Sequence, residues 1–279
     1  MLQIRPVEQN DPSRAVVGAG PAQTALLRYV SAEVYRLSPG VEWRRRVGPA
    51  QESAVVVLTG EVTVREPERV ASSVGRRRSV FESVLPYVLY LPSGREVHLT
   101  ALTEAEVVWA QAELPEPSTL PPRLWGPEEM TSEQRGEGVT AREVRHLLEE
   151  PGQAMRLRLV EVVTPAGHWS SFPPHKHDED VPGRESLLEE LYYYHLSPPS
   201  GWALQRVYDG QGWGEVMAVG DGDLVMVPRG YHPFAVPPGY TAYYLNIMAG
   251  TTRDWRFTVD PAFRHVPSFH VPERTSRHD

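Results

Sequence analysis

Cysteine is absent from this sequence of 279 residues. Disulfide bonds, thiolate nucleophiles and cysteine-containing zinc sites are therefore excluded, and a bound metal ion would take its ligands from histidine, aspartate or glutamate. The sequence also lacks an apolar run of roughly 18 residues and an apolar segment near its amino terminus of the kind found in signal peptides. We therefore expect a cytoplasmic protein with no membrane partner.

An excess of positive charge is missing as well. The formal net charge is −8 and the pI is about 5.7, so the protein has no overall attraction for nucleic acid or an anionic membrane. Two arginine runs, 44–46 and 76–78, are local exceptions without interleaved aromatic residues. We interpret both as solvated strand ends or loops, and we expect no nucleic-acid partner.

Proline and glycine are abundant, with 27 and 22 residues, which favours many turns and short strands. Segments rich in Val, Leu, Thr and Tyr lie between these turns, at 53–65, 83–92, 94–102, 105–113, 155–165, 189–196, 201–209, 222–228 and 241–249. They predict an all-β protein built as a sandwich or barrel. One short helix is expected at 140–150, where Thr140 and Glu143 match a capping box and apolar residues follow at helical spacing.

The two halves of the chain resemble each other. Residues 89–111 can be laid on residues 225–247, with a shared Pro-x-Gly turn. This predicts two β-barrel domains, residues 1–135 and 136–279.

The proline-dense segment 113–129 reads as a linker or a strap across the surface. Under the alignment of the two halves, Glu96 occupies the position of His232, and His98 is the single histidine before residue 140. We therefore expect the first barrel to be without metal and the chemistry to lie in the second.

The stretch FPPHKHD, residues 172–178, carries the main chemical signal. Residues two apart on a strand face the same side, so His175 and His177 can bind one ion while Lys176 points away. Glu190 begins an alternating strand that can bring a carboxylate to the same interior, and His232 follows a Gly- and Pro-containing turn. Three imidazoles and one carboxylate suit a divalent transition-metal ion, and this order of ligands is the pattern of cupins.

Longer stretches resemble one family. PAGHWSSFPPHKHD (165–178), LEELYYYHLSPPSGWALQRVYD (188–209), GDLVMVPRGYHPFAVPPGYTAYYLNIMAG (222–250) and RDWRFTVDP (253–261) are similar to the 5-deoxy-glucuronate isomerases of inositol catabolism, which are two-barrel cupins related to the ketol-isomerases of pectin-derived hexuronates. The resemblance is weak over residues 1–130 and dense from 136 to 261. Phe172 and His168 depart from the residues usual in the family, Tyr and Asn, and neither is a proposed ligand.

The resemblance implies isomerisation of 5-deoxy-D-glucuronate to 5-dehydro-2-deoxy-D-gluconate. The implied metal ligands are His175, His177, Glu190 and His232. Zinc is the implied ion, with Mn²⁺, Fe²⁺ and Ni²⁺ as alternatives, and the partner is a small sugar acid.

Such a reaction needs a general base and a partner for the substrate carboxylate. Tyr194, on the Glu190 face of its strand, is our choice of base; the other candidates are Tyr208, Tyr231, Tyr244, Asp178 and Glu179. Arg206, beside Tyr208, or Arg229 could bind the carboxylate. Asn246 could bind a substrate hydroxyl or a barrel carbonyl.

Three other functions stay open from the sequence. They are a cupin oxygenase that uses iron, a ketol-isomerase acting on a hexuronate from pectin, and a sugar-binding cupin without enzymatic activity. An edge strand of a barrel can also pair between subunits, so a homo-oligomer is among the expectations.

Overall fold

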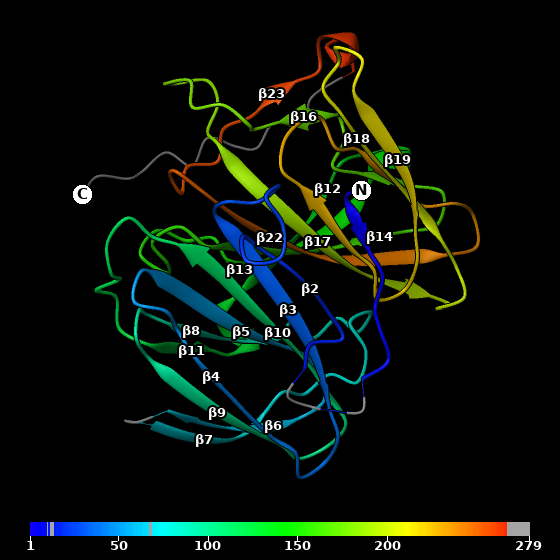
Figure 1. Ribbon diagram of the computed structural model, residues 1–279. Helices are drawn as coiled ribbons and strands as arrows, with labels where there is room; N and C mark the ends of the chain where they lie inside the picture. The colour runs from blue at the N-terminus through cyan, green and yellow to red at the C-terminus, as the bar shows by residue number, and fades with distance from the viewer. Residues whose placement is uncertain (10, 12–13, 67–68, 267–279) are drawn as a thin grey trace.

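The computed structural model describes residues 1–266 except residues 10, 12–13 and 67–68, so residues 267–279 of the predicted second domain lie outside the described part. Figure 1 shows two β-rich lobes, an earlier one in blue and teal and a later one in green to orange. In the described residues the only helical turns are short 3-10 segments, η1 (Pro127–Glu129), η2 (Gly138–Thr140) and η3 (Pro261–Phe263). The predicted all-β fold is confirmed.

The first barrel consists of two antiparallel sheets. The larger sheet has the order β11 (Arg123–Trp125), β8 (Tyr87–Leu91), β5 (Gln51–Thr59), β10 (Ala105–Glu113), β3 (Val30–Leu37) and β2 (Val17–Ala19). The smaller sheet has the order β4 (Glu42–Arg46), β9 (Glu96–Ala101), β6 (Val62–Glu66) and β7 (Arg69–Val74). Their inner faces enclose an apolar core that includes Trp43 and Trp109, whose rings meet edge-on at 5.6 Å.

The second barrel repeats this plan with additions. Its larger sheet has the order β1 (Gln3–Ile4), β20 (Leu224–Val227), β17 (Leu188–Ser197), β22 (Thr241–Gly250), β14 (Arg158–Thr164), β13 (Arg142–Leu148) and β12 (Thr131–Arg135). The smaller sheet has the order β15 (Trp169–Ser170), β21 (Phe234–Ala235), β18 (Ala203–Tyr208) and β19 (Gly214–Val219), and β16 (His175–Lys176) pairs with β23 (Thr258–Val259).

Side chains alternate between the two faces of each strand, and the protein has three apolar cores: one inside each barrel and one between the barrels. In β17, Tyr192 and Tyr194 face the interior of the second barrel, whereas Leu191 and Tyr193 face the first barrel. The two large sheets therefore pack face to face over a shared core. Burying each such side chain stabilises the fold by about 1.5–3 kcal/mol, which explains why strands that are apolar on both faces form the middle of each sheet.

Strand pairing defines equivalent positions in the two barrels. Ser53 of β5 pairs with Leu91 and Gln111, and Glu190 of β17 pairs with Val227 and Met248. Ser53 therefore occupies in the first barrel the place that Glu190 occupies in the second. The alignment of 89–111 with 225–247 holds at β8 and β20 and slips by one residue at β10 and β22.

The segment between the barrels lies along the first one. Within 113–129, β11 pairs with β8, and Ser118 Oγ lies 2.7 Å from the hydroxyl of Tyr90, so the segment is a strap rather than a free linker. The boundary between 135 and 136 stays a prediction. β12 before it pairs with β13, and β1 pairs with β20, so both strands contribute to the second large sheet (Figure 1).

The helix expected at 140–150 is wrong, because this segment forms β13. Val144 faces the interior of the second barrel, and Leu147 and Leu148 belong to the shared core. A register shift between His146 and Leu148 breaks the simple alternation that would have identified a strand. Thr140 Oγ1 accepts from the N–H of Glu137 at 3.3 Å, so the expected capping box with Glu143 does not form.

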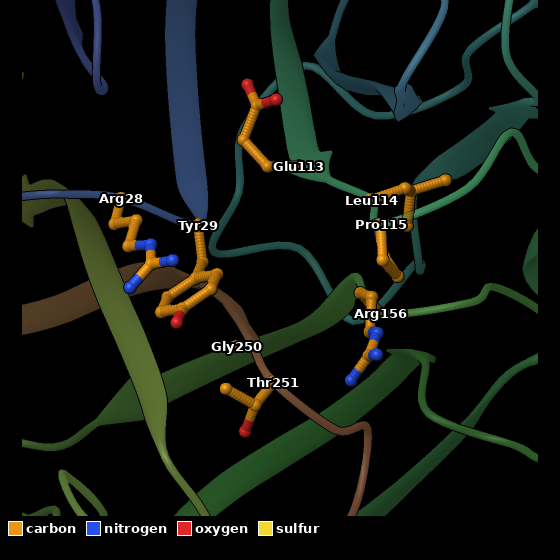
Figure 2. Close-up of a pocket in the computed structure, with 8 residues that line it drawn as sticks. All are labelled: Arg28, Tyr29, Glu113, Leu114, Pro115, Arg156, Gly250 and Thr251. Carbon is orange, nitrogen blue, oxygen red and sulfur yellow. The ribbon is translucent and has the colours of Figure 1, made fainter.

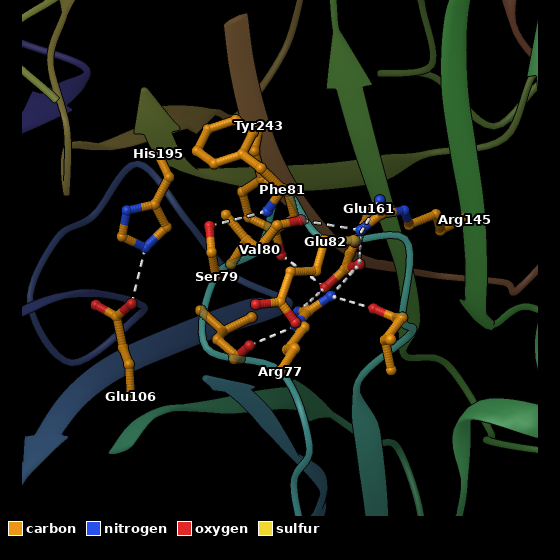
Figure 3. Close-up of polar contacts among 12 residues, drawn as sticks. Arg77, Ser79, Val80, Phe81, Glu82, Glu106, Arg145, Glu161, His195 and Tyr243 are labelled. Carbon is orange, nitrogen blue, oxygen red and sulfur yellow. Dashed lines mark hydrogen bonds and ion pairs between the residues drawn. The ribbon is translucent and has the colours of Figure 1, made fainter. Parts of the chain in front are cut away.

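One arginine of the run 76–78 is buried, against expectation. Arg77 is 1% exposed and forms an ion pair with Glu161 of β14, which is 0% exposed (Figure 3). Arg145 Nη1 lies 3.5 Å from Glu161, and Tyr243 donates to it at 2.8 Å. A buried charge is tolerated only when it is paired and hydrogen-bonded. Arg77 therefore joins the two barrels, whereas Arg76 and Arg78 on either side of it are exposed as expected.

A cavity of about 360 Å³ opens where the two barrels meet, as Figure 2 shows. Its lining comes from both barrels: Arg28, Tyr29, Glu113, Leu114, Pro115, Arg156, Gly250 and Thr251. None of these residues is a predicted metal ligand. No helix among the described residues is long and apolar enough to cross a membrane.

Candidate metal centre

Three histidines converge at one end of the second barrel. His175 belongs to β16, His177 follows it, and His232 precedes β21; one ligand nitrogen from each lies within 4.8 Å of the others. His232 lies between the other two rings, with centroids 4.9 Å from His175 and 5.0 Å from His177. The structure therefore brings together the three imidazoles that the sequence predicted as ligands.

Glu190 completes the group from β17. Its Oε1 lies 3.0 Å from His177 Nε2 and its Oε2 lies 3.4 Å from His232 Nε2. The carboxylate is 1% exposed. Glu189, its neighbour, faces the other way and accepts backbone N–H groups of residues 28 and 29, as the alternation of the strand predicts.

Backbone carbonyls orient all three rings. The Nδ1 atoms lie 2.9, 2.8 and 2.9 Å from the carbonyl oxygens of Pro173, Leu188 and Gly230, respectively. A proton on Nδ1 that is donated to a carbonyl leaves the lone pair of Nε2 directed at the centre. Metal-binding histidines are held in this way, because the second hydrogen bond fixes both the tautomer and the ring.

The buried atoms at the centre have no hydrogen-bond partner among the described residues. These are Nε2 of His177, Nε2 of His232 and Oε2 of Glu190. A buried polar atom without a partner costs about 1–3 kcal/mol, so three together in one place require an explanation. A divalent ion bonded to three nitrogens and one oxygen supplies it, and the donor set fits such an ion.

The charges of the four groups agree with metal binding. Burial, then the charges of His232 and His177, lowers the pKa of His175 to about 3. Burial also lowers the pKa of His232. Burial would raise the pKa of Glu190, yet His232 and His177 hold it below its usual range. Burial opposes protonation of His177, but Glu190 raises the pKa of its ring, so a metal ion bound there would compete with a proton.

The loops that carry the histidines are tied together. Lys176 points away from the centre, as predicted, and binds Asp178 and Glu185. Asp178 Oδ2 accepts from the N–H of Gly230 at 2.7 Å, which joins the His177 loop to the His232 turn. Gly230 has φ +90°, and a Cβ there would lie 2.6 Å from the carbonyl oxygen of Tyr208. Only glycine fits that turn without strain.

Sequence reasoning missed the aromatic wall of the site. Trp255 lies 5.1 Å from the His177 ring, and Phe257 lies 4.8 Å from the His175 ring. Both come from the segment after β22, within the stretch RDWRFTVDP. The family resemblance marked that stretch but gave no role to either ring, because their contacts lie roughly 80 residues away in sequence.

The predicted tyrosines lie inside or beside the barrel. Tyr194 stacks on Phe234 at 5.3 Å and donates to Gln205 Oε1 at 2.8 Å. Burial raises the pKa of Tyr194 well above its usual value, and burial raises that of Tyr244 to about 12. Tyr244 lies 4.9 Å from Tyr192 and lines the same interior. Both phenols therefore hold their protons.

Arg206 and Tyr208 lie on the other face of β18. Arg206 is exposed, with its Cζ 3.9 Å from the centroid of the Tyr208 ring. Tyr208 donates to Asp260 Oδ2 at 2.5 Å. Arg229 lies over Trp213 at 5.0 Å. Arg206 and Arg229, the predicted partners of a substrate carboxylate, are thus exposed and do not face the barrel interior as Glu190 does.

The fold and the centre together define a class. Two β-barrels in one chain, with a histidine-rich centre in one of them that fits a divalent metal ion, make this protein a bicupin. Its fold is similar to that of oxalate decarboxylase from Lactobacillus farciminis in a formate complex, with a TM-score of 0.65 and 10% identity over 93% of this chain and 88% of that one. That likeness concerns the fold alone.

The chain belongs to the KduI/IolB family, whose model matches residues 4–266. It is 42% identical over 240 residues to the 5-deoxy-glucuronate isomerase of Geobacillus thermodenitrificans (strain NG80-2), covering 86% of each chain. It is also similar to the crystal structure of an IolB-like protein from Salmonella typhimurium LT2, with a TM-score of 0.89 and 37% identity over 95% of this chain and 98% of that one. The resemblance found in the sequence is confirmed.

Proposed function

We propose that the protein is a metal-dependent isomerase that converts the aldose 5-deoxy-D-glucuronate into its keto isomer, 5-dehydro-2-deoxy-D-gluconate, in the cytoplasmic breakdown of inositol. The observation that carries the proposal is the convergence of His175, His177, His232 and Glu190, with inward atoms of the last three unpartnered. Family membership and the name of the 42%-identical relative support the choice of reaction and substrate.

The reaction moves one proton from C2 to C1 and another from the C2 hydroxyl to the C1 oxygen, so no oxidant is consumed. When bound, the ion would act as a Lewis acid on the carbonyl and the adjacent hydroxyl. Glu190, His175 and His232 would hold it in their deprotonated forms. Trp255 and Phe257 pack against the rings of His177 and His175 and would keep bulk water from them.

Zinc is our proposal for the ion, because three histidines and a carboxylate are ligands that it accepts, with Mn²⁺, Fe²⁺ and Ni²⁺ as alternatives. The choice of Tyr194 as general base and the substrate contacts of Arg206, Tyr208 and Tyr244 stay predictions from the sequence. The raised pKa of Tyr194 is unfavourable for a base at neutral pH.

The test is to follow 5-deoxy-D-glucuronate by NMR in D₂O with purified protein, with and without air. We expect the keto isomer to appear at equal rates in both, with deuterium entering at C1 if the transferred proton exchanges with solvent. A requirement for O₂ would indicate an oxygenase instead. Conversion of a pectin-derived hexuronate, with none of 5-deoxy-D-glucuronate, would move the proposal to the related ketol-isomerases.

A further inference from the structure

Two buried donors beside the metal centre have no partner among the described residues. They are Nε of Arg158 and Nδ2 of Asn246. Arg158 is 9% exposed and Asn246 is 5% exposed. Neither atom can be satisfied by the proposed ion, because a guanidinium and an amide NH₂ are donors and not ligands. An acceptor supplied by a bound molecule would satisfy them.

The strand register places both residues on the face that carries Glu190. Met248 of β22 pairs with Glu190 on one side and with Arg158 on the other. Asn246, two residues before Met248, pairs with Tyr192 and Val160. The backbones of Glu190 and Arg158 are therefore two strand spacings apart, about 10 Å, and Asn246 is a diagonal neighbour of both.

Other contacts hold the Arg158 guanidinium in place. Its Nη1 donates to the carbonyl oxygen of Arg253 at 2.9 Å, and its Nη2 binds Glu149. Its Cζ lies 5.6 Å from the centroid of Trp255, whose ring touches His177. The Glu149 carboxylate also hydrogen-bonds His146, so it interacts with both His146 and Arg158. Two of the three nitrogens are thus anchored, and the Nε edge alone is left for a ligand.

The first barrel serves as an internal comparison. At the positions of Glu190, Asn246 and Arg158 it has Ser53, Trp109 and Ser31, as the equivalent pairings show. Trp109 is 2% exposed and fills the interior. The barrel fold therefore does not require an arginine and an amide at these places. They accompany the metal ligands.

Resting on the proposed function, we propose that Arg158 binds the carboxylate of the sugar acid and that Asn246 binds a hydroxyl of the same molecule. The carbonyl end would then lie at the histidines while the acid end lies against β14. A carboxylate on Arg158 makes a charge-assisted hydrogen bond in a dry site, which is stronger than a neutral one. The arrangement would select a sugar acid over a neutral sugar.

Binding of two non-reacting probes tests this inference. One is the substrate with its C1 aldehyde reduced to an alcohol, and the other is the same polyol with a hydroxymethyl group in place of the carboxylate. Calorimetry with metal-loaded wild type should show the acid binding at least tenfold more tightly. Arg158→Gln should lose about tenfold or more for the acid and less than about twofold for the polyol, because charge-assisted bonds contribute on that scale.

Asn246→Leu should weaken both probes by a similar factor, because a hydroxyl is common to both. Arg44→Gln, an exposed change in the first barrel, is the matched control and should leave both affinities unchanged. Metal content and melting temperature are measured for each variant. If Arg158→Gln unfolds, Arg158→Lys replaces it and should keep part of the preference for the acid, because its charge remains.

Equal affinity of the wild type for the two probes would overturn the inference, as would an undiminished acid preference in metal-loaded Arg158→Gln. These failures differ from failure of the proposed function. A wild type that binds the acid through Arg158 but isomerises nothing would contradict the isomerase proposal and leave the acid-binding residue in place.

Discussion

Glu52 and Glu189 occupy equivalent positions in the two barrels, and each carboxylate binds the backbone of the other barrel. Glu52 accepts the N–H groups of residues 155, 156 and 157, and Glu189 accepts those of residues 28 and 29. Each pairs with an alanine at the same place, Ala112 or Ala249. The chain thus joins its two barrels by a reciprocal contact at the start of β3 and β14.

Replacing either carboxylate by an amide should destabilise the protein. In Glu52→Gln or Glu189→Gln an NH₂ group would face backbone donors, and we expect a loss of about 1–3 kcal/mol in the free energy of unfolding. Denaturant unfolding at neutral pH measures it. Glu42→Gln, at an exposed pair with Arg44, is the control and should change stability by less than about 1 kcal/mol. Equal effects at all three sites would contradict the account.

The stability of the protein should depend on pH through His195 and Glu106, which join the barrels (Figure 3). Burial alone would lower the pKa of His195, but Glu106 and Asp221 outweigh burial and raise this pKa from 6.5 to about 9. Burial alone would raise the pKa of Glu106, but His195 and Tyr193 outweigh burial and lower this pKa from 4.5 to about 2. The contribution of His195 is thus full below pH 6.5 and lost as pH rises through 9, and that of Glu106 is lost as pH falls from 4.5 through 2.

The measurement compares wild type with His195→Gln by denaturant unfolding from pH 4 to 10. The difference between them should be largest between pH 4.5 and 6.5, on the order of 1–3 kcal/mol, and should shrink between 6.5 and 9. A difference that stays constant across this range would show that the pair acts by shape alone.

Removal of one ligand should remove the ion without unfolding the barrel. We expect His232→Ala to lose bound metal and turnover while its far-UV circular dichroism is unchanged, because the core of the second barrel is apolar and does not depend on an ion. Glu96→Ala, at a half-exposed pair with His98 in the first barrel, is the matched control and should keep both metal and rate. Loss of metal with full turnover would disprove a metal-dependent reaction.

Tyr194→Phe tests the sequence-based choice of general base. The structure leads us to expect a kcat within about tenfold of wild type and a stability loss of about 1 kcal/mol, because the variant loses the hydrogen bond to Gln205. A fall in kcat of a hundredfold or more at unchanged metal content would establish Tyr194 as the base.

The sequence could predict that His175, His177, Glu190 and His232 come together, because alternation along a strand shows which residues share a face. His175 and His177 are two residues apart, and Glu190 shows its face by alternation with its neighbours. The strands could also be predicted, because short runs of apolar and β-branched residues bounded by turns are typical of strands. The helix predicted at 140–150 was wrong because of tertiary context. Residues on both faces of β13 are buried, and a register shift gives its apolar residues a spacing like that of a helix.

The buried positions of Arg158 and Arg77 could not be predicted. Arg158 acquires its place from Arg253 and Trp255, and Arg77 from Glu161, all distant in sequence. An arginine in a strand reads as exposed unless its partner is known, because its charge is costly to bury alone.

The central claim is that one ion held by His175, His177, Glu190 and His232 is needed for isomerisation of 5-deoxy-D-glucuronate. The most direct measurement is a titration of metal-stripped protein with Zn²⁺, following turnover and bound metal together. The account predicts that the rate rises linearly and levels off at one ion per chain, with no such rise in His232→Ala. Full turnover in the stripped protein, with no metal detected, would contradict it.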